Sequence, residues 1–449
     1  MEEISLKNTL KMSDSYLHFA NRPAGKFLCS KLGLPIPPLL DRAQHGPLQI
    51  VTNLAVSCAP NAVFESAIEN TLDSTVIADE DTRLNGLVFD ASGITHSAQL
   101  ETLYQVISPQ LKRLNRNAKI VIVGLDSATL NDTAYRISQR ALVGFVKSLA
   151  KELGRKGITV NLIAAANGCH DELAAPLAFL CSKRNVYVTG QVIKVSKTEG
   201  IIKRCDKPLQ GKLALVTGAT QGIGLAMAQA LSNDGATVIG LDIPAMAAPL
   251  SQAMDSINGE SLALDISGEN ASQLIAAHLN ERTLDIIVHN AGITRDKTLG
   301  RMQAQQWQQL LNINLVAIER VNHYLLKHDL IAQHGRIIGV SSINGIAGAA
   351  GQTNYATAKA GVIGMVDALS EPLQAKGITI NAVAPGFIET RMTAAVPFMP
   401  RQIARRACSF SQGGLPIDVA QVVALFAAPQ SQGLTGNVLR VCGQNIIGA

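Results

Sequence analysis

A tyrosine and a lysine four residues apart are the first candidates for chemistry in this sequence. Tyr355 and Lys359 fall in a stretch with helical spacing, so both side chains should project from one face of one helix. An ammonium group beside a phenol favours the phenolate, which predicts a Tyr355 pKa lowered from about 10 toward neutral. Such a phenol could donate a proton to a developing alkoxide near pH 7.

Two more polar residues could complete a catalytic group. Ser342 lies just after the strand-like run RIIGVS, where its hydroxyl could hold a carbonyl oxygen. Asn314, in the helical run LLNINLVA, could hold a water that returns protons to the lysine. A tyrosine–lysine pair alone is usually a surface helix pair, so the assignment depends on the elements that position these four residues.

A glycine-rich turn precedes them in the chain. The apolar run Leu213–Thr217 is followed by Gly218-Ala-Thr-Gln221-Gly222-Ile223-Gly224 and then by the helical run LAMAQALS. Glycines at this spacing permit a tight turn and let a diphosphate approach the backbone at a helix N-terminus. Because the turn lies between a predicted strand and a predicted helix, it predicts a dinucleotide site.

Acidic residues follow the next two predicted strands. Asp242 ends TVIGL, where a carboxylate can accept hydrogen bonds from both hydroxyls of an adenosine ribose and repel a 2′-phosphate. This favours NAD over NADP, although a solvated carboxylate at a strand end is the simpler alternative. Asp265, after SLAL, could contact the adenine, and Asn290-Ala291-Gly292 places small residues beside the nucleotide.

The elements that carry these residues occur twice. Residues 134–166 align with 354–386 without a gap at an offset of 220, and VTGQVIKV (188–195) matches LTGNVLRV (434–441). We also align GPLQIVTN (46–53) with GKLALVTG (211–218). Alternating strand-like and amphipathic runs predict an α/β fold of two tandem, doubly wound parallel sheets of the Rossmann type. The strands expected in the second copy are Leu213–Thr217, Thr237–Leu241, Asp285–His289, Arg336–Ser341, Ile378–Ala384 and Asn437–Val441.

The first copy lacks the features needed for catalysis. On our alignment, Asn53, Ser57 and Ala59 replace Gly218, Gly222 and Gly224, which would block a diphosphate. Tyr135 is kept, but Gln139 replaces the lysine and Leu125 the serine. We therefore divide the chain into an N-terminal extension (1–45) with an extended GLPIPP segment, a degenerate non-catalytic domain (46–205) and a catalytic domain (206–449). The helix positions Leu142, Phe145, Val146, Leu149 and Leu153 stay apolar, which indicates a packing role for the first copy.

Composition narrows the function classes. The net charge of +5 is not concentrated in a basic block and aromatics make up 4%, which argues against nucleic-acid binding. The seven scattered cysteines and nine histidines form no metal-ligand pattern, so we expect no metal and reduced thiols. Neither a signal peptide nor a long apolar run is evident, so we expect a cytoplasmic protein that does not bind membranes.

The complete set of motifs resembles the short-chain dehydrogenase/reductase family. The glycine turn, Asp242, NAG, Asn314, Ser342, YxxxK and Pro385-Gly386 occur in that family's order. GRIIGVSS, GQTNYATAKAGVIGM and GITINAVAPGFIETRM are most similar to its 3-oxoacyl-(acyl-carrier-protein) reductases, and the tandem plan is similar to their high-molecular-weight branch. The resemblance covers 206–449 strongly and 46–205 weakly.

This resemblance implies hydride transfer from nicotinamide to the 3-keto carbon of a thioester in fatty acid metabolism, with Tyr355 protonating the oxygen. Asn314, Ser342, Tyr355 and Lys359 would be catalytic, and Lys359 would also bind the nicotinamide ribose. The cofactor-binding residues would be Gly218, Gln221, Gly222, Ile223, Gly224, Asp242, Asp265, Ile266, Asn290, Ala291, Gly292, Tyr355, Lys359, Pro385, Gly386, Ile388 and Thr390.

Two points depart from the family's pattern. Ordinary members use NADPH and carry small or hydroxylic residues at the position of Asp242, so we expect NADH to be preferred and NADPH to be the second choice. Of two basic docking positions, one matches Lys376 and the other is Gln333, so acyl-carrier protein and CoA stay equal candidates. Further docking candidates, with a solvated basic face as the alternative, are Arg391, Arg401, Arg405 and Arg406.

Two other functions stay open. The same residues serve dehydrogenases of other secondary alcohols, such as steroids or polyols, and a dinucleotide-sensing or scaffold protein could use the fold without turnover. Because family members commonly form tetramers, we expect two chains with two units each to form a homodimer. We expect the apolar end, Asn445 to Ala449, to be buried near the contact between the chains.

Overall fold

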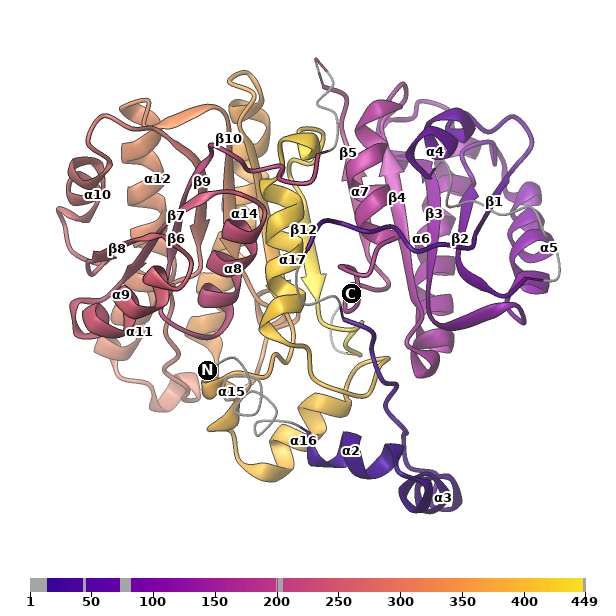
Figure 1. The fold of residues 1–449 in the computed structure, drawn as a ribbon, viewed down its shortest axis with the longest axis horizontal. Helices are drawn as coiled ribbons and strands as arrows, with labels where there is room; N and C mark the ends of the chain where they lie inside the picture. The colour runs from indigo at the N-terminus through magenta and orange to yellow at the C-terminus, as the bar shows by residue number, and fades with distance from the viewer. Residues whose placement is uncertain (1–13, 43–45, 73–81, 199, 201–204, 447–449) are drawn as a thin grey trace.

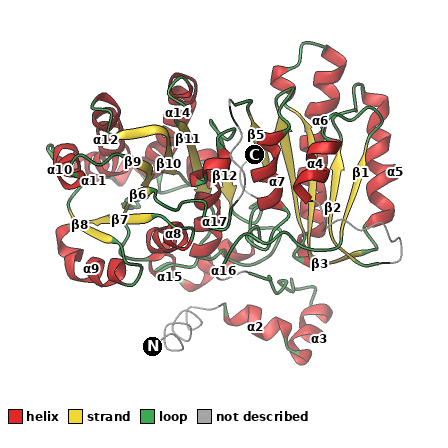
Figure 2. Ribbon diagram, turned by 45° about the horizontal axis from the view of Figure 1, so that its top comes forward, coloured by secondary structure: helices red, strands yellow, loops and turns green. Residues whose placement is uncertain are grey.

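The computed structural model describes residues 14–42, 46–72, 82–198, 200 and 205–446. Two separate parallel sheets form the molecule, one of five strands in the order β1-β2-β3-β4-β5 and one of seven in the order β12-β11-β10-β9-β6-β7-β8. Helices flank both sheets (Figure 2). The predicted α/β class with two doubly wound, Rossmann-like sheets is confirmed.

The first unit carries the smaller sheet (Figure 1). Its elements are β1 (Leu54–Cys58), α4 (Glu65–Leu72), β2 (Leu84–Asp90), α5 (Glu101–Gln110), β3 (Leu114–Leu125), α6 (Thr133–Leu153), β4 (Thr159–Ala165), α7 (Ala174–Leu180) and β5 (Val192–Val195). Every residue of β4 is buried, as expected for a parallel strand covered by helices on both faces.

The second unit carries the larger sheet. Its strands are β6 (Leu213–Thr217), β7 (Thr237–Asp242), β8 (Glu260–Ala263), β9 (Leu284–His289), β10 (Ile331–Val340), β11 (Thr379–Pro385) and β12 (Val438–Val441). Its helices are α8 (Gly222–Asn233), α9 (Ala247–Asp255), α10 (Ala271–Leu279), α11 (Ala304–Leu311), α12 (Ala317–Lys327), α13 (Ile343–Ala347), α14 (Thr353–Gln374), α15 (Arg391–Ala394), α16 (Phe398–Arg406) and α17 (Pro416–Ala427). All six expected strands are present, with ends that differ by a few residues, and β8 is additional.

The alignment of residues 46–53 with 211–218 is wrong. The first strand of the smaller sheet is β1, Leu54–Cys58, so LAVSC corresponds to LALVT of β6. Ser57 therefore lies inside the strand, and Ala59 occupies the position of Gly218. The segment that we had aligned instead lies against the end of α7, where the Val51 amide donates to the Cys181 carbonyl at 2.9 Å.

The smaller sheet ends at β1, whereas β6 is followed at the sheet edge by β7 and β8. Residues 59–83 connect β1 to β2, and among those described only α4 is regular. In the larger sheet the corresponding connection spans residues 218–283 and contains the strand that ends in Asp242. The described part of the first unit thus has no strands that correspond to β7 and β8, beside which an adenosine is expected in the second unit.

The apolar positions of α6 are used inside the first unit. Leu142, Val146, Leu149 and Leu153 are buried in a core with β2, β3 and β4, and Phe145 packs at its margin. The packing role expected for these positions is therefore mainly internal to the first unit.

The two units meet along β5 and β12 in a nearly two-fold arrangement. Asn437 accepts from the Lys194 amide at 2.9 Å and donates to the Lys194 carbonyl at 3.0 Å. Gln191, which corresponds to Asn437 in the repeat, accepts from the Arg440 amide at 3.2 Å, and Arg440 corresponds to Lys194. Equivalent residues thus contact each other reciprocally, as at the interface of a symmetric dimer.

The apolar layer at this seam is continuous. One buried cluster includes Leu177 and Tyr187 of the first unit together with Val422 and Phe426 of the second. Helix α17 is buried on nearly all sides because it lies between α8 and the first unit (Figure 1).

The N-terminal extension crosses the seam. After α2 (Ser15–Asn21) and α3 (Pro23–Lys31), residues 34–42 run without regular structure, as the prolines predicted. The Pro38 carbonyl accepts from Gln412 Nε2 at 2.6 Å, and Arg42 forms a two-bond ion pair with the buried Asp418 of α17. The extension is thereby attached to the second unit.

Candidate active site

The glycine turn joins β6 to α8 in the second unit. Gly218 and Gly222 have φ values of +68° and +61°, which favour glycine, and a Cβ on Gly224 would lie 2.0 Å from the Gly218 carbonyl oxygen. Helix α8 begins at Gly222, so its free amides face the turn, and Ile223 is half-buried behind them. These features fit a diphosphate held at a helix N-terminus.

The Asp242 carboxylate lies beside this turn. It accepts from the Thr220 amide at 3.2 Å and from the Ile243 amide at 2.9 Å. Asp265 is exposed and accepts from the amide and hydroxyl of Ser267, while Ile266 is buried. Both carboxylates therefore lie after neighbouring strands at one end of the sheet, as the sequence indicated.

Asn290 connects the turn to the end of β9. Its Nδ2 donates to the carbonyls of Thr217 at 2.9 Å and Gly218 at 3.2 Å. A Cβ on Gly292 would lie 3.3 Å from Asn314 Oδ1, and Ala291 packs against the neighbouring core. The small residues thus maintain a close approach between the turn and the catalytic helices.

Tyr355, Ser342 and Lys359 come together at the ends of β10 and α14. The Ser342 side chain lies close enough to the Tyr355 hydroxyl to lower its pKa, and Ser342 accepts from the Asn344 amide at 3.1 Å as the N-cap of α13. Lys359 Nζ lies 5.7 Å from the centre of the Tyr355 ring and donates to the Val340 carbonyl at 2.7 Å. The three side chains form one cluster.

The expected acidification of Tyr355 is not present. Burial raises the pKa of Tyr355, the neighbouring Ser342 hydroxyl lowers it and the nearby Asp296 raises it, with a net upward shift. Burial also lowers the pKa of Lys359 to about 8. The expectation was wrong because burial of the phenol itself disfavours the phenolate, which leaves Tyr355 protonated at neutral pH.

Asn314 lies in a π-helical turn, Asn312–Val316, between α11 and α12. Such turns are rare and often mark functional sites. Its Oδ1 accepts from the Ile293 amide and its Nδ2 donates to the Ile293 carbonyl, both at 2.9 Å. The Asn314 side chain therefore anchors the loop after Gly292, and the water expected at this residue stays a prediction.

The segment after β11 returns to the glycine turn. A Cβ on Gly386 would lie 2.6 Å from Cys442 Cβ, so the backbone passes close to the chain after β12. Ile388 is 2% exposed and pairs with Gly414, and the Thr390 side chain caps α15. Because the Thr390 methyl lies 3.8 Å from the position of a Cβ on Gly222, the segment borders the expected cofactor site.

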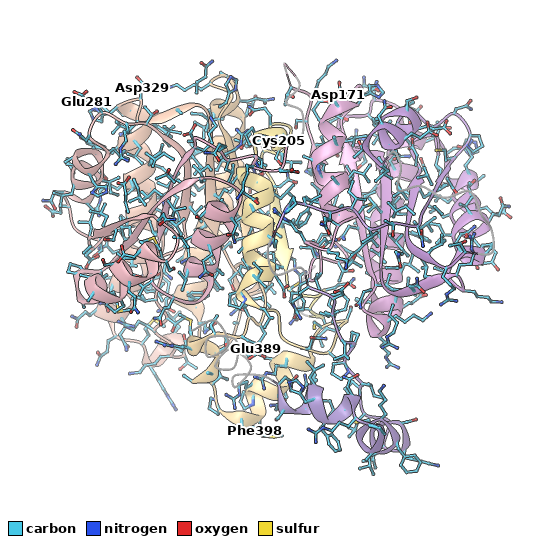
Figure 3. The ribbon with its side chains drawn as sticks, in the orientation of Figure 1. Asp171, Cys205, Glu281, Asp329, Glu389 and Phe398 are labelled. Carbon is cyan, nitrogen blue, oxygen red and sulfur yellow. The ribbon has the colours of Figure 1, made fainter. Side chains whose placement is uncertain are left out.

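The basic residues proposed for docking are dispersed. Lys376 pairs with Asp329 at 3.2 Å, and Figure 3 places Asp329 and Glu389 at opposite ends of the molecule. Arg405 is buried in a two-bond ion pair with Glu389, and Arg406 pairs with Asp14 of the extension. The internal pairing of Arg405 and Arg406 argues against docking by these two side chains, whereas Lys376 is exposed and stays a docking prediction.

The other two basic candidates lie on the segment around α15 and α16. Arg391 is exposed and donates to Gln221 of the glycine turn at 3.1 Å, and Arg401 donates to the Ala394 carbonyl at 3.0 Å. Arg391 thus borders the glycine turn, whereas Arg401 is bonded to the end of α15.

The sequence analysis did not identify a polar chain beside Tyr355. Asn344 donates to Gln352 at 2.7 Å, and Gln352 donates to Asp296 at 2.8 Å. Asn354 is buried and accepts from the Tyr355 amide at 2.8 Å. The only signal for these residues was the polar QTN immediately before Tyr355, because loop residues show no periodicity.

In the first unit the corresponding cluster is closed. Gln139 accepts from the Leu125 amide at 2.8 Å and donates to the carbonyls of Ala91 and Ile94, both at 2.9 Å. The Tyr135 hydroxyl donates to the Ser92 carbonyl, and burial raises its pKa. Each side chain therefore satisfies backbone groups and leaves no polar cluster for a substrate.

A doubly wound sheet with a glycine turn and a tyrosine–serine–lysine cluster defines a nicotinamide-dependent oxidoreductase. Residues 212–399 match the short chain dehydrogenase family, and residues 77–167 match a family described as enoyl-(acyl carrier protein) reductase. The chain belongs to the short-chain dehydrogenase family.

Curated relatives support this assignment. The 3-oxoacyl-(acyl-carrier-protein) reductase of Vibrio harveyi is 41% identical over 52% of this chain and 97% of its own length. Those of Thermotoga maritima and Escherichia coli K12 are 36% and 38% identical over 53% and 52% of this chain and 99% and 97% of their own lengths. Each of these relatives has about the length of the second unit.

Two further features of the described residues concern membrane-spanning helices and metal-binding groups. None of the described helices is long and apolar enough to cross a membrane. Within the same residues, no group of three or more histidine, cysteine or acidic side chains is arranged to hold a metal ion. All seven cysteines are free thiols.

Proposed function

We propose that the second unit reduces the 3-keto group of a 3-oxoacyl thioester to the 3-hydroxyacyl thioester in fatty acid biosynthesis. The observation that carries the proposal is the cluster of Tyr355, Ser342 and Lys359 in the same unit as a glycine turn suited to a dinucleotide. The names of relatives that are 36–41% identical supply the substrate class.

The chain's own residues then have distinct roles. Tyr355, protonated at neutral pH, donates its proton to the carbonyl oxygen as that oxygen becomes an alkoxide, and the Ser342 hydroxyl holds the same oxygen. Lys359 replaces the proton on the phenol and holds the nicotinamide ribose. When bound, the nicotinamide supplies the hydride to the 3-keto carbon. Asn314 fixes the loop from Gly292 to Ile293 against the catalytic helices.

We propose NADH as the preferred cofactor and NADPH as the weaker one. The support is the Asp242 carboxylate at the Thr220 amide, beside the turn that would hold the diphosphate. A ribose at this end of β7 would meet a hydrogen-bond acceptor, whereas a 2′-phosphate would meet a like charge.

The thioester carrier is acyl-carrier protein or CoA. Both carriers present phosphate groups; Arg391 is exposed beside the glycine turn, and the half-buried Arg401 lies on α16, which follows α15. We assign them to phosphate contacts because they lie on the segment around α15 and α16.

The first unit, residues 46–205, is proposed to be non-catalytic, and residues 206–449 to form the catalytic domain behind the extension 1–45. Support comes from Gln139 in place of a lysine and from the shorter smaller sheet. We also propose a homodimer of such chains. Asn445 is buried and Ile446 is exposed; Ile447 to Ala449 lie outside the described residues, so burial of the chain end at a dimer contact stays a prediction.

The proposal is tested by following NADH absorbance with acetoacetyl-CoA, an acetoacetyl carrier protein, a steroid ketone and a keto sugar. Oxidation of NADH by either thioester, and by neither of the others, is expected. Reduction of the steroid or sugar alone would make the protein a different dehydrogenase. NADH binding without turnover of any substrate would indicate a sensor or scaffold.

A further inference from the structure

One aromatic side chain of the first unit is buried inside the second. Tyr187 follows α7 and is 2% exposed, and its hydroxyl donates to the Gln412 carbonyl at 2.7 Å. Its ring lies 5.8 Å from the Phe410 ring. Cβ atoms on Gly414 and Gly443 would lie 2.6 Å and 3.0 Å from the Tyr187 ring, so these glycines make room for it.

The loop that Tyr187 holds is bonded to the expected cofactor segment. The Gly414 amide donates to the Phe387 carbonyl at 3.0 Å, and the Glu389 amide donates to the Gly414 carbonyl at 2.8 Å. These two bonds form the bridge between Ile388 and Gly414. Displacement of the Gln412–Gly414 loop would therefore also displace the segment that includes Ile388 and Thr390.

Accordingly, we propose that Tyr187, supplied by the non-catalytic unit, is a positioning residue for the cofactor-binding segment 386–390 of the catalytic unit. The inference rests on the proposed function, because that function assigns the segment to the cofactor. It gives the first unit a role in catalysis although its own cluster is closed.

The seam is asymmetric at this position. The Ser196 amide donates to the Gly433 carbonyl at 2.9 Å, and the Gly443 amide donates to the Tyr187 carbonyl at 3.1 Å, so Tyr187 and Gly433 have nearly equivalent places. They also correspond in the repeat. A Cβ on Gly433 would lie 2.7 Å from the Ser196 carbonyl oxygen, which leaves no space for a side chain. The tyrosine side chain therefore crosses the seam only from the inert unit into the active one.

The hydroxyl of Tyr187 has a specific purpose at this seam. A phenylalanine would fill the same apolar space, whereas a buried hydroxyl is costly unless it is hydrogen-bonded. Burial raises the pKa of Tyr187 well above its ordinary value, so the hydroxyl stays a donor to the Gln412 carbonyl. The Gln412 carbonyl also accepts from Cys408 Sγ at 3.2 Å, a weaker donor, so Tyr187 supplies the stronger of its two bonds.

The test compares Tyr187→Phe with Tyr135→Phe in the full-length protein. Each change removes from the first unit one tyrosine hydroxyl that donates to a backbone carbonyl. The Tyr187 hydroxyl donates to Gln412 of the second unit, whereas the Tyr135 hydroxyl donates to Ser92 of its own unit. Three quantities are measured for each variant: Tm, the Kd for NADH by fluorescence without acyl substrate, and amide hydrogen exchange of residues 386–390 and 409–414 in the free protein.

We expect Tyr187→Phe to speed exchange at the Glu389 and Gly414 amides and to raise the Kd for NADH about five- to tenfold, the effect of losing one buried hydrogen bond. Tyr135→Phe should lower Tm by a similar amount and leave both other quantities unchanged. The proposal is overturned if both variants lower Tm alike and neither changes exchange or NADH affinity.

These outcomes separate the inference from the proposed function. If the wild type binds NADH but reduces no thioester, the substrate assignment fails, and the exchange and affinity data still test Tyr187. If acetoacetyl-CoA is reduced and Tyr187→Phe behaves like Tyr135→Phe, the function stands and the positioning role is refuted.

Discussion

Replacing Asp242 with asparagine should reverse or abolish the preference for NADH. Asparagine keeps an oxygen that can accept from the Thr220 amide, at 3.2 Å in the wild type, so the glycine turn should keep its shape. The change removes the negative charge at the end of β7 and the second acceptor oxygen, which accepts from the Ile243 amide at 2.9 Å in the wild type. Any change in cofactor choice then reports electrostatics and ribose hydrogen bonding, without a change in the fold.

The expected size follows from the exposure of the site. Two unit charges 4 Å apart repel by about 1 kcal/mol in water and about 4 kcal/mol at an effective dielectric of about 20. Asp242 is half-buried at the surface, which favours the lower value, and a 2′-phosphate carries nearly two charges. The repulsion removed is therefore about 2 kcal/mol, or a change of about 30-fold in the NADH/NADPH ratio of kcat/KM.

The assay measures kcat/KM for both cofactors at low and high salt with one thioester substrate. Most of the change in Asp242→Asn should be a gain with NADPH, and salt should weaken the wild-type preference because the site is partly exposed. Asp265→Asn is the control, since adenine is common to both cofactors and the ratio should not move. A wild type that prefers NADPH, or an unchanged ratio in Asp242→Asn, would refute our interpretation of the carboxylate.

Three other predictions concern the catalytic cluster and the assembly. Tyr355→Phe should abolish reduction and retain NADH affinity, whereas Lys359→Ala should impair both reduction and NADH affinity. Tyr135→Phe and Gln139→Ala should leave turnover per folded enzyme unchanged. Steady-state kinetics and NADH titration of the four variants check these expectations. The pKa of Lys359 is about 8 in the folded chain and about 10.5 in the unfolded chain, so between these pH values only the unfolded chain keeps the proton. The free energy of unfolding should therefore rise with pH in this range. Lys359→Met should remove that part of the slope in urea unfolding, and an identical slope in both proteins would contradict the assignment. Sedimentation equilibrium should give a mass near two chains, and a stable, fully active monomer would disprove the homodimer.

Much of the second unit could be predicted because its strands are short, apolar and separated by amphipathic helices. β6 occurs where LALVT predicted it, and the glycines of the turn have the positive φ values that the motif requires. β8 was not predicted because its residues ESLA alternate between partly buried and exposed at the sheet edge, where the apolar signal is weak.

Other errors have physical causes beyond local sequence. The misplaced alignment of the first copy arose because LQIVT and LAVSC are both apolar runs of strand length, and only pairing with β2 distinguishes them. The Tyr355 pKa was misjudged because spacing places Lys359 on the same helix face but does not reveal that the phenol is buried, which is the largest cause of its raised pKa. Contacts with segments distant in sequence decided both cases.

The duplication has preserved the seam and discarded the nucleotide site. Asn161 and Asn381 occupy equivalent strands, and each amide bonds the loop before the seam strand, at the Val188 carbonyl and the Leu434 carbonyl. The same two side chains accept from the amides of Gln191 and Asn437. These bonds lie within each unit and hold Gln191 and Asn437, the two side chains that bond reciprocally to Arg440 and Lys194 across the seam. The first unit lacks the lysine and the glycine turn but keeps every one of these bonds, which is the pattern expected if its function is to support the second.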